Sequence, residues 1–196
     1  MMTSLWRPAS AAATAITLLT GCGLTGQVTT QGAELSEWFT VTSPAFRDGG
    51  QLPVRFGCSA YAGGQGRTPP LRWSWGASST PTRAFAIVMD DPDAPEGAAV
   101  HWVIANIDGT TAELAEGADR DNDSTVEGAN TFGKVGYTPP CPAQGEQHRY
   151  RFTIYALSER VPLAEGAPPK VSLPDIAKRT IGRGRITGNF GSTETR

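Results

Sequence analysis

Short apolar runs, each followed by turn-forming residues, dominate the chain and restrict its fold more than any other feature. The runs are rich in Val, Ile, Thr, Phe and Trp, and Gly, Pro, Asp or Ser separates them. Runs of this length and composition are typical of β-strands, and their close spacing favours an antiparallel β fold. We expect strands over 38–43, 51–58, 71–75, 84–90, 101–107, 149–157 and 184–190.

Two of these runs also predict which faces are buried. The run AFAIVM at 84–89 has no polar alternation, so it should be a central strand buried on both faces. The run RYRFTIYAL at 149–157 alternates between apolar and polar residues, as a strand with one buried face does. Its apolar face holds Tyr150, Phe152, Ile154 and Ala156.

One helix is expected near residues 173–181. Ser172 is a candidate N-cap, and Pro174 and Asp175 suit the first turn of a helix. The sequence shows no internal repeat and no second domain. The chain should therefore form one β-rich domain with little helix.

The composition agrees with a single globular domain. Hydrophobic residues make up 39% of the chain and charged residues 18%, which is enough apolar material for a core. The formal net charge is -2, whereas a nucleic-acid-binding surface needs an excess of basic residues. No nucleic acid partner is predicted, and a small pocket for an anion remains compatible with this charge.

The N-terminal residues predict export. Residues 9–20 are apolar but too short to span a bilayer, which is typical of a signal-peptide core. The motif LTGC that ends at Cys22 resembles a bacterial lipoprotein signal, in which the cysteine becomes the lipidated first residue. A plain secretory peptide cut nearby is the alternative.

This interpretation divides the chain and places it in the cell envelope. A lipidated Cys22 would hold the protein on the extracytoplasmic face of the membrane. Residues after it lack apolar periodicity and would form a tether long enough to lift a domain off the surface. The expected segments are a signal peptide over 1–21, a flexible tether over 22–36 and one domain over 37–196.

With Cys22 lipidated, Cys58 and Cys141 remain as an even pair. Export places them in an oxidising compartment, where a disulfide can form. The alternative is two buried thiols, because the sequence does not give the distance between them.

An acidic loop before residue 130 has the spacing that begins an EF-hand, with Asp119, Asp121 and Asp123. The sixth position, where the EF-hand turn needs glycine, is Ser124, and the twelfth is Asn130 instead of a bidentate glutamate. A solvated acidic loop is therefore favoured over a calcium site.

The chain has two histidines, and each begins a predicted strand after a proline-rich loop. His101 follows the turn DPDAP at 91–95, and His148 follows the loop GYTPPCPAQGEQ at 136–147. Proline fixes φ, so both loops should be rigid, and rigid loops on a sheet commonly carry binding groups. Taken singly, each histidine could equally be a structural hydrogen-bonding residue, and the Asp-Pro turn only a turn.

These motifs together resemble the phosphatidylethanolamine-binding proteins, in particular their bacterial Raf-kinase-inhibitor-like branch. The motifs are DPDAP, VHWVIANI, NTFGKVGYTPPCP and HRYRFTIYAL, in this order, and the resemblance extends from about residue 38 to about 190. It implies two antiparallel sheets in a Greek-key-like β-sandwich, with one or two flanking helices. It also implies one small cavity for phosphate or a phospholipid headgroup, and no metal or other cofactor.

The matching motifs place specific residues at this cavity. Three departures from the family pattern bear on it: Pro139 where a glycine is usual, the segment GRTPPL at 66–71, and Phe190 where a tyrosine is common. Proline lacks the amide donor that glycine would offer, so Pro139 changes the number of donors available to a ligand. The ligand-binding residues carried over are Asp91, Asp93, Pro95, His101, Pro140, His148 and Tyr150.

The chemistry of these residues suits a zwitterionic ligand. Imidazole and phenol groups can donate hydrogen bonds to phosphate oxygens, and a protonated imidazole does so more strongly. Ionised aspartates only accept hydrogen bonds and would repel a phosphate. We expect them either to orient a histidine or to accept hydrogen bonds from an amine, such as that of phosphoethanolamine.

Other classes of function are weighed against this one. The sequence contains no G-x-S-x-G nucleophile motif and no other pattern that indicates a reaction, so the chain is not expected to be an enzyme. Two His and two Asp could serve as metal ligands, but neither H-x-H nor H-E-x-x-H is present. The remaining alternative is an inhibitor of a protease or kinase that uses the rim of the same pocket.

Overall fold

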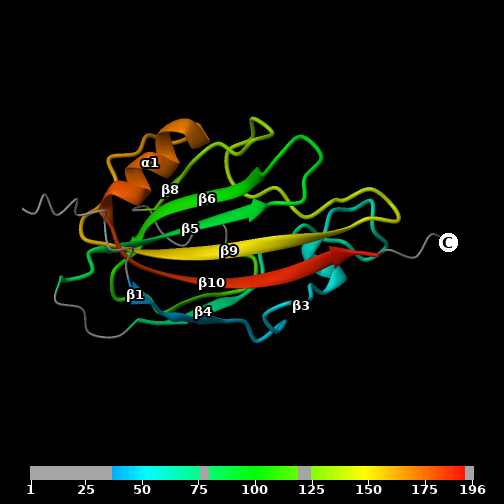
Figure 1. Cartoon of the computed structure of the whole chain (residues 1–196), viewed down its shortest axis with the longest axis horizontal. Helices are drawn as coiled ribbons and strands as arrows, with labels where there is room; N and C mark the ends of the chain where they lie inside the picture. Colours follow the sequence, from blue (N-terminus) through cyan, green and yellow to red (C-terminus); the bar gives the residue numbers. More distant parts are fainter. Residues whose placement is uncertain (1–36, 76–79, 119–124, 193–196) are drawn as a thin grey trace, which may run out of the picture. The chain divides into compact units, whose positions relative to one another are not determined.

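Two β-sheets and one helix form the domain (Figure 1). The computed structural model describes residues 37–75, 80–118 and 125–192. The expected signal peptide, Cys22, the tether and the three aspartates of the acidic loop lie outside these ranges. In the described residues, no helix is both long and apolar enough to cross a bilayer.

The larger sheet has seven strands. Its spatial order is β1 (Glu37–Trp38), β10 (Thr180–Gly191), β9 (Gln147–Leu157), β5 (Ala84–Asp91), β6 (Ala99–Asp108) and β8 (Val126–Glu127), and β3 (Gly50–Gln51) also pairs with β10. The smaller sheet has the order β2 (Thr40–Thr42), β4 (Leu71–Ser74) and β7 (Glu113–Leu114). The prediction of a mainly β, two-sheet fold is confirmed.

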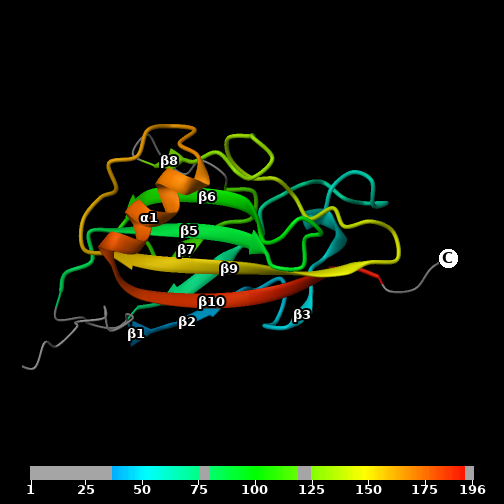
Figure 2. The ribbon, with the colours of Figure 1, turned by 45° about the horizontal axis from the view of Figure 1, so that its top comes forward.

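The larger sheet is the middle of three layers. One of its faces packs against the smaller sheet through a core that includes Phe85, Ile87 and Phe152. Its other face packs against α1 (Pro169–Arg179) through residues that include Ala86 and Ile176. Figure 2 shows the helix on one side of β5, β6 and β9, and β2 and β4 on the other.

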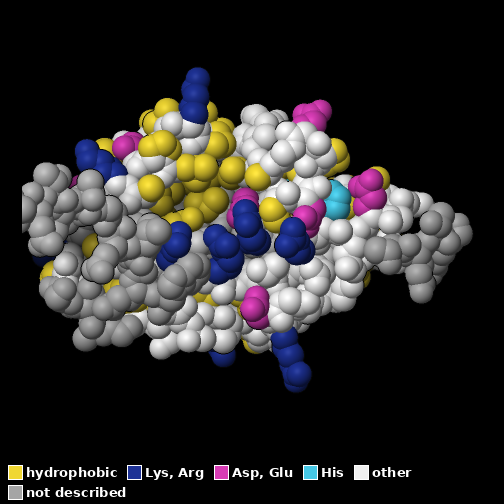
Figure 3. Space-filling model, in the orientation of Figure 1, with side chains coloured by type: hydrophobic (Ala, Val, Ile, Leu, Met, Phe, Trp, Pro, Cys, Tyr) yellow, Lys and Arg dark blue, Asp and Glu magenta, His cyan; other side chains and the backbone are white. Residues whose placement is uncertain are grey.

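This layering explains the two burial patterns. β5 lies between β6 and β9, and all its residues from Ala84 to Met89 are buried, as predicted for a strand covered on both faces. In β9 the predicted apolar face is buried, and outward-facing residues such as Arg151 and Tyr155 keep some exposure. Apolar side chains gather beside α1 on this outer face, next to a group of Lys and Arg side chains (Figure 3).

Glycines on the inner face of β10 allow the rest of the sandwich to approach it closely. A Cβ atom at Gly182 would lie 2.1 Å from the Trp75 ring, and one at Gly184 would lie 2.5 Å from the Phe39 carbonyl oxygen. Separations below 3.0 Å are steric clashes, so residues with side chains could not replace these glycines without a shift of the neighbouring segments.

Several strand boundaries differ from the prediction. The run 51–58 is not one strand, because Pro53 has no amide hydrogen for a ladder, and the chain turns instead into a short 3-10 helix, η1 (Val54–Phe56). The run 38–43 divides at Phe39 into β1 and β2, which belong to different sheets. The larger sheet is also not wholly antiparallel, since β1 and β3 both pair parallel with β10.

The helix begins earlier than predicted. Its N-cap is Pro168, not Ser172, because Pro169 occupies the first turn, where its missing amide hydrogen costs no hydrogen bond. Ser172 is fully buried, and its hydroxyl donates to the Pro168 carbonyl at 3.4 Å. Pro174 therefore lies inside the helix, and the chain passes at Thr180 directly into β10.

Candidate functional site

A cavity of about 420 Å³ lies where the 91–95 turn, the start of β6 and the start of β9 meet. These segments are far apart in the sequence, and the pairing of β5 with both β6 and β9 brings them together. Five of the predicted residues line this cavity: Asp91, Pro95, His101, His148 and Tyr150.

His148 and Asp91 form a nearly buried pair at this cavity. The Nδ1 atom of His148 donates to Oδ2 of Asp91 at 2.8 Å. The other carboxylate oxygen, Oδ1, accepts from the backbone amide of Asp93 at 2.8 Å and so fixes the turn. Burial alone would lower the pKa of His148, but the hydrogen bond to Asp91 and the charges of Asp91 and Glu146 hold that pKa above its ordinary value.

The pKa of His101 is shifted in the opposite direction from that of His148. Its Nδ1 donates to the Thr138 carbonyl at 2.9 Å, which leaves Nε2 as a hydrogen-bond acceptor in the neutral ring. Burial lowers the pKa of His101 and outweighs the opposing effects of the Thr138 carbonyl and the Asp91 charge. Near neutral pH, His148 is thus the better donor and His101 offers an acceptor.

Tyr150 connects the two histidines. Its ring centroid lies 5.3 Å from that of His101, edge to face, and 6.4 Å from that of His148, nearly stacked. The two imidazole rings can therefore be no farther apart than the sum of these distances. Burial raises the pKa of the Tyr150 hydroxyl, and the Asp91 charge raises it further, so the hydroxyl stays protonated.

Two of the predicted residues do not line the cavity. The Asp93 carboxylate instead accepts from the Arg149 backbone amide at 2.9 Å and pairs with the Arg149 guanidinium at 2.6 Å. That pairing lowers the pKa of Asp93 to about 2. Pro140 is buried, and its carbonyl accepts from the Cys58 amide at 2.9 Å, so it supports the wall from behind. The ligand-binding role of both residues stays a prediction.

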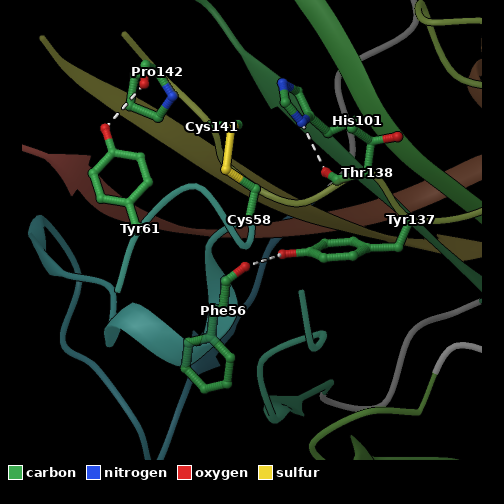
Figure 4. Close-up of a disulfide and its surroundings, with 8 residues drawn as sticks. All are labelled: Phe56, Cys58, Tyr61, His101, Tyr137, Thr138, Cys141 and Pro142. Carbon is green, nitrogen blue, oxygen red and sulfur yellow. Dashed lines mark hydrogen bonds between the residues drawn. A yellow bond between two sulfur atoms is a disulfide. The ribbon is translucent and has the colours of Figure 1, made fainter. Parts of the chain in front are cut away.

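A disulfide between Cys58 and Cys141 forms part of this wall (Figure 4). The Cα atoms are 5.4 Å apart, and the bond joins the segment after η1 to the 139–142 loop. The Tyr61 hydroxyl donates to the Pro142 carbonyl at 2.9 Å and fixes the same loop a second time. Because Cys141 itself lines the cavity, the cavity depends on a covalent bond typical of an oxidising compartment.

The departures from the family pattern have different consequences. Pro139 lines the cavity and offers no amide hydrogen to a ligand. Phe190 does not line it: the ring is buried and lies edge to face with Tyr61, with centroids 4.8 Å apart. The absence of a hydroxyl at Phe190 therefore removes nothing from the cavity.

Residues 130–138 carry cavity groups that the sequence analysis missed. Phe132 is half exposed and lies edge to face with His101 at 4.9 Å, and the exposed Lys134 also lines the cavity. The buried Asn130 fixes this loop, because its Oδ1 accepts from the backbone amides of Phe132 and Lys134. Its Nδ2 donates to the side-chain hydroxyl of Thr138 and to a backbone carbonyl. These residues belong to the motif NTFGKVGY, but no hydrophobic periodicity in that segment indicated which of its side chains face the cavity.

Glu146 is a further cavity residue that the sequence analysis missed. Its carboxylate is half exposed and lies 3.3 Å from Nε2 of His148, on the side opposite Asp91. His148 therefore lies between a buried and an exposed carboxylate. An anionic ligand that reaches His148 must displace the Glu146 carboxylate, which is then free to accept from a cationic group of the same ligand.

The described residues do not assemble a metal centre at this site. Within the three described ranges no group of three or more His, Cys, Asp or Glu side chains is placed to hold a metal ion. Cys141 is in a disulfide and has no thiol to ionise. The cavity is organised as a set of hydrogen-bond donors and acceptors of defined charge.

The fold and the cavity define a β-sandwich protein with a small pocket, lined by histidine, carboxylate and aromatic side chains, at one end of its larger sheet. The sequence profile of the phosphatidylethanolamine-binding proteins matches residues 42–191. The chain belongs to this family.

Relatives and solved structures agree with this assignment. A Mycobacterium tuberculosis protein named "Putative lipoprotein LppC" is 36% identical over 162 residues, which cover 82% of this chain and 76% of that protein. A UPF0098 protein of Methanothermobacter thermautotrophicus is 37% identical over 149 residues, 74% of this chain and 94% of the relative. The crystal structure of Escherichia coli YbcL, described as a new member of the mammalian PEBP family, superposes with a TM-score of 0.71 at 30% identity and covers 78% of this chain and 98% of YbcL.

Proposed function

We propose that this protein is a non-enzymatic binding protein for a phosphorylated ligand that also carries a hydrogen-bond donor, such as a phosphoethanolamine headgroup. The observation that carries the proposal is the opposite character of the two histidines in one cavity. The Asp91 carboxylate raises the pKa of His148 and accepts from its Nδ1, whereas burial lowers the pKa of His101, whose Nδ1 meets the Thr138 carbonyl and leaves Nε2 as an acceptor in the neutral ring. A ligand that matches both must offer an anionic oxygen and a donor group.

The other cavity residues fit the two ends of such a ligand. Lys134 adds a cation at the rim, and the Tyr150 hydroxyl remains a donor at neutral pH. Glu146 is the carboxylate best placed for an ammonium group, because its side chain lines the cavity and is half exposed, whereas Asp91 is buried against His148 and Asp93 pairs with Arg149 outside the cavity. In this proposal Asp91 orients the His148 ring and Asp93 holds Arg149. Glu146, and not the aspartates, accepts hydrogen bonds from the amine of the ligand.

The proposed location is the extracytoplasmic face of the cell membrane, with the chain anchored through a lipidated Cys22. The disulfide at the cavity wall and the M. tuberculosis relative named as a lipoprotein support this location. A membrane-tethered domain of this kind would meet phospholipid headgroups at high local concentration.

Isothermal titration calorimetry with three soluble probes tests the proposal. Phosphoethanolamine should bind more tightly than phosphate, and ethanolamine should bind weakly. Glu146→Gln should reduce the preference for phosphoethanolamine over phosphate, and His148→Gln should weaken both about tenfold or more, since a charge-assisted hydrogen bond is lost. The control Glu159→Gln changes an exposed carboxylate that pairs with Arg179 and should change neither affinity. Equal binding of phosphate and phosphoethanolamine by the wild type and by Glu146→Gln would contradict the proposal.

One observation favours the alternative, an inhibitor that binds a protease or kinase through the rim. Phe132 and Val135 are 51% and 48% exposed, and both belong to the loop beside the cavity. Exposed apolar groups next to a polar pocket are common at protein interfaces. Failure of all three probes, together with capture of a protein partner that Phe132→Ala abolishes, would favour the inhibitor.

A further inference from the structure

A second cavity, of about 400 Å³, lies between α1 and the outer face of the larger sheet. Its lining is mainly apolar, and four elements supply the apolar residues: Leu173, Ile176 and Ala177 come from α1, Val88 from β5, Val100 from β6 and Tyr155 from β9. None of these residues lines the histidine cavity. The volume is within the range of cavities that hold small ligands.

The polar edge of this second cavity is cationic. Arg151 and Arg185 line it, and Asp90 is its one lining carboxylate. Asp90 is engaged by the Arg151 guanidinium through two nitrogens, so this pair is close to neutral. Arg185 donates through Nε to the Thr153 hydroxyl at 2.9 Å, and no carboxylate of the described residues forms an ion pair with it. The other guanidinium nitrogens of Arg185 remain suitable for an anion.

The surface around the cavity also combines an apolar region with a cationic one. Apolar side chains gather beside α1, and Lys and Arg side chains follow β9 and β10 directly next to them (Figure 3). The alternate residues Arg149 and Arg151 of β9 and Arg183 and Arg185 of β10 face outward on this side of the sheet. An apolar hollow bordered by guanidinium groups is complementary to a molecule with an apolar tail and an anionic head.

We propose that this cavity binds a single-chain anionic amphiphile of the fatty-acid type. The tail would lie between the helix and the sheet against Val100, Tyr155 and Leu173, which are partly exposed, so binding removes apolar surface from water on both partners. The carboxylate head would pair with Arg185 at the edge. The site uses no residue of the histidine cavity, so it is independent of the function proposed above.

The experiment is calorimetric titration of the whole domain with dodecanoate below its micelle-forming concentration, with dodecyltrimethylammonium as a tail-matched cation. Dodecanoate should bind and the cation should not. Arg185→Gln should weaken dodecanoate at least tenfold, and Arg72→Gln, the same change on the far sheet in an exposed ion pair, should leave it unchanged. His148→Gln should also leave it unchanged.

A second variant tests the apolar half of the cavity. Ala177 is exposed on α1 and lines the hollow, so Ala177→Phe should fill the hollow without disturbing the core and abolish dodecanoate binding, while Ala177→Ser should retain it. An unchanged or higher Tm would show that Ala177→Phe is folded. The proposal is overturned if dodecanoate does not bind, if the cation binds equally well, if binding is seen only on lipid vesicles, or if neither Arg185→Gln nor Ala177→Phe weakens it.

Discussion

The His148–Asp91 pair gives the most specific prediction for this protein. Asp91 accepts two hydrogen bonds, one on each carboxylate oxygen, from the His148 ring and from the Asp93 amide. Asn has one acceptor oxygen, an amide donor and no charge, so Asp91→Asn loses all of the charge pairing, and it loses one of these bonds when the His148 ring is protonated. When the ring is neutral, the amide nitrogen can donate to Nδ1 instead. The substitution keeps the size of the side chain and should not open a cavity.

The loss of stability should depend on pH. Because the pKa of folded His148 lies above its ordinary value, the pair stabilises the fold fully below the ordinary histidine pKa, and this contribution is lost as pH rises through the raised value. Hydrogen bonds to charged groups contribute about 1.5–3 kcal/mol and neutral ones about 0.5–1.5 kcal/mol. Asp91→Asn should therefore lower the free energy of unfolding by about 1.5–3 kcal/mol at pH 5.5 and by about 0.5–1.5 kcal/mol at pH 8.5.

Urea unfolding at the two pH values measures this difference, and NMR titration of the His148 ring measures its pKa directly. The pKa of His148 should fall in Asp91→Asn, because burial then acts without the opposing carboxylate. Asp108→Asn is the control: this exposed carboxylate accepts from Thr110 and is ionised at both pH values, so its effect should be the same at each. An equal loss at both pH values in Asp91→Asn, with an unchanged pKa of His148, would refute the electrostatic role of Asp91.

Three further predictions concern parts of the structure around the site. Arg149→Ala should raise the pKa of Asp93 from about 2 toward the ordinary aspartate value, measured by NMR, so that acid unfolding begins at higher pH while phosphoethanolamine still binds; an unchanged pKa would exclude Arg149 as the cause. Replacement of Cys58 and Cys141 by serine should lower the free energy of unfolding by about 2–4 kcal/mol in urea and weaken ligand binding, whereas an unaltered midpoint would show that the disulfide is dispensable. Gly184→Ala places a methyl group 2.5 Å from a backbone oxygen and should cost about 1–3 kcal/mol by thermal unfolding; full stability would mean that the two layers separate easily.

Local patterns were reliable where one physical effect decides them. The alternation in 149–157 and the continuous apolar run at 84–89 predicted the buried faces of β9 and β5 correctly, because burial fixes which side chains can be polar. The prediction was wrong for the strand 51–58 and for the start of the helix. In both places a proline determines the backbone conformation. Pro53 has no amide hydrogen for a strand ladder, and the fixed φ of Pro169 suits the first turn of a helix.

The sequence predicted some of the residues that line the cavity, and the differences have a common cause. Residues that the resemblance placed at the cavity, such as His101 and His148, do line it, but Asp93 does not, because its carboxylate has a nearer partner in Arg149. Lys134 and Glu146 were missed because a charged residue in a loop carries no sequence signal of its orientation. Side-chain pairing across strands decides such positions, and it depends on register.

The amino-acid sequence by itself determined the class of fold, the central strand and most residues of the candidate site, because these follow from local composition and from motifs along the chain. Tertiary structure alone decided that the pKa of His148 is raised and that of His101 is lowered. Asp91 is 57 residues from His148 in the sequence, and the pairing of β5 with β9 places the two side chains 2.8 Å apart, whereas Nδ1 of His101 meets the Thr138 carbonyl. A pKa depends on distance and burial in space, and neither can be read from the order of residues.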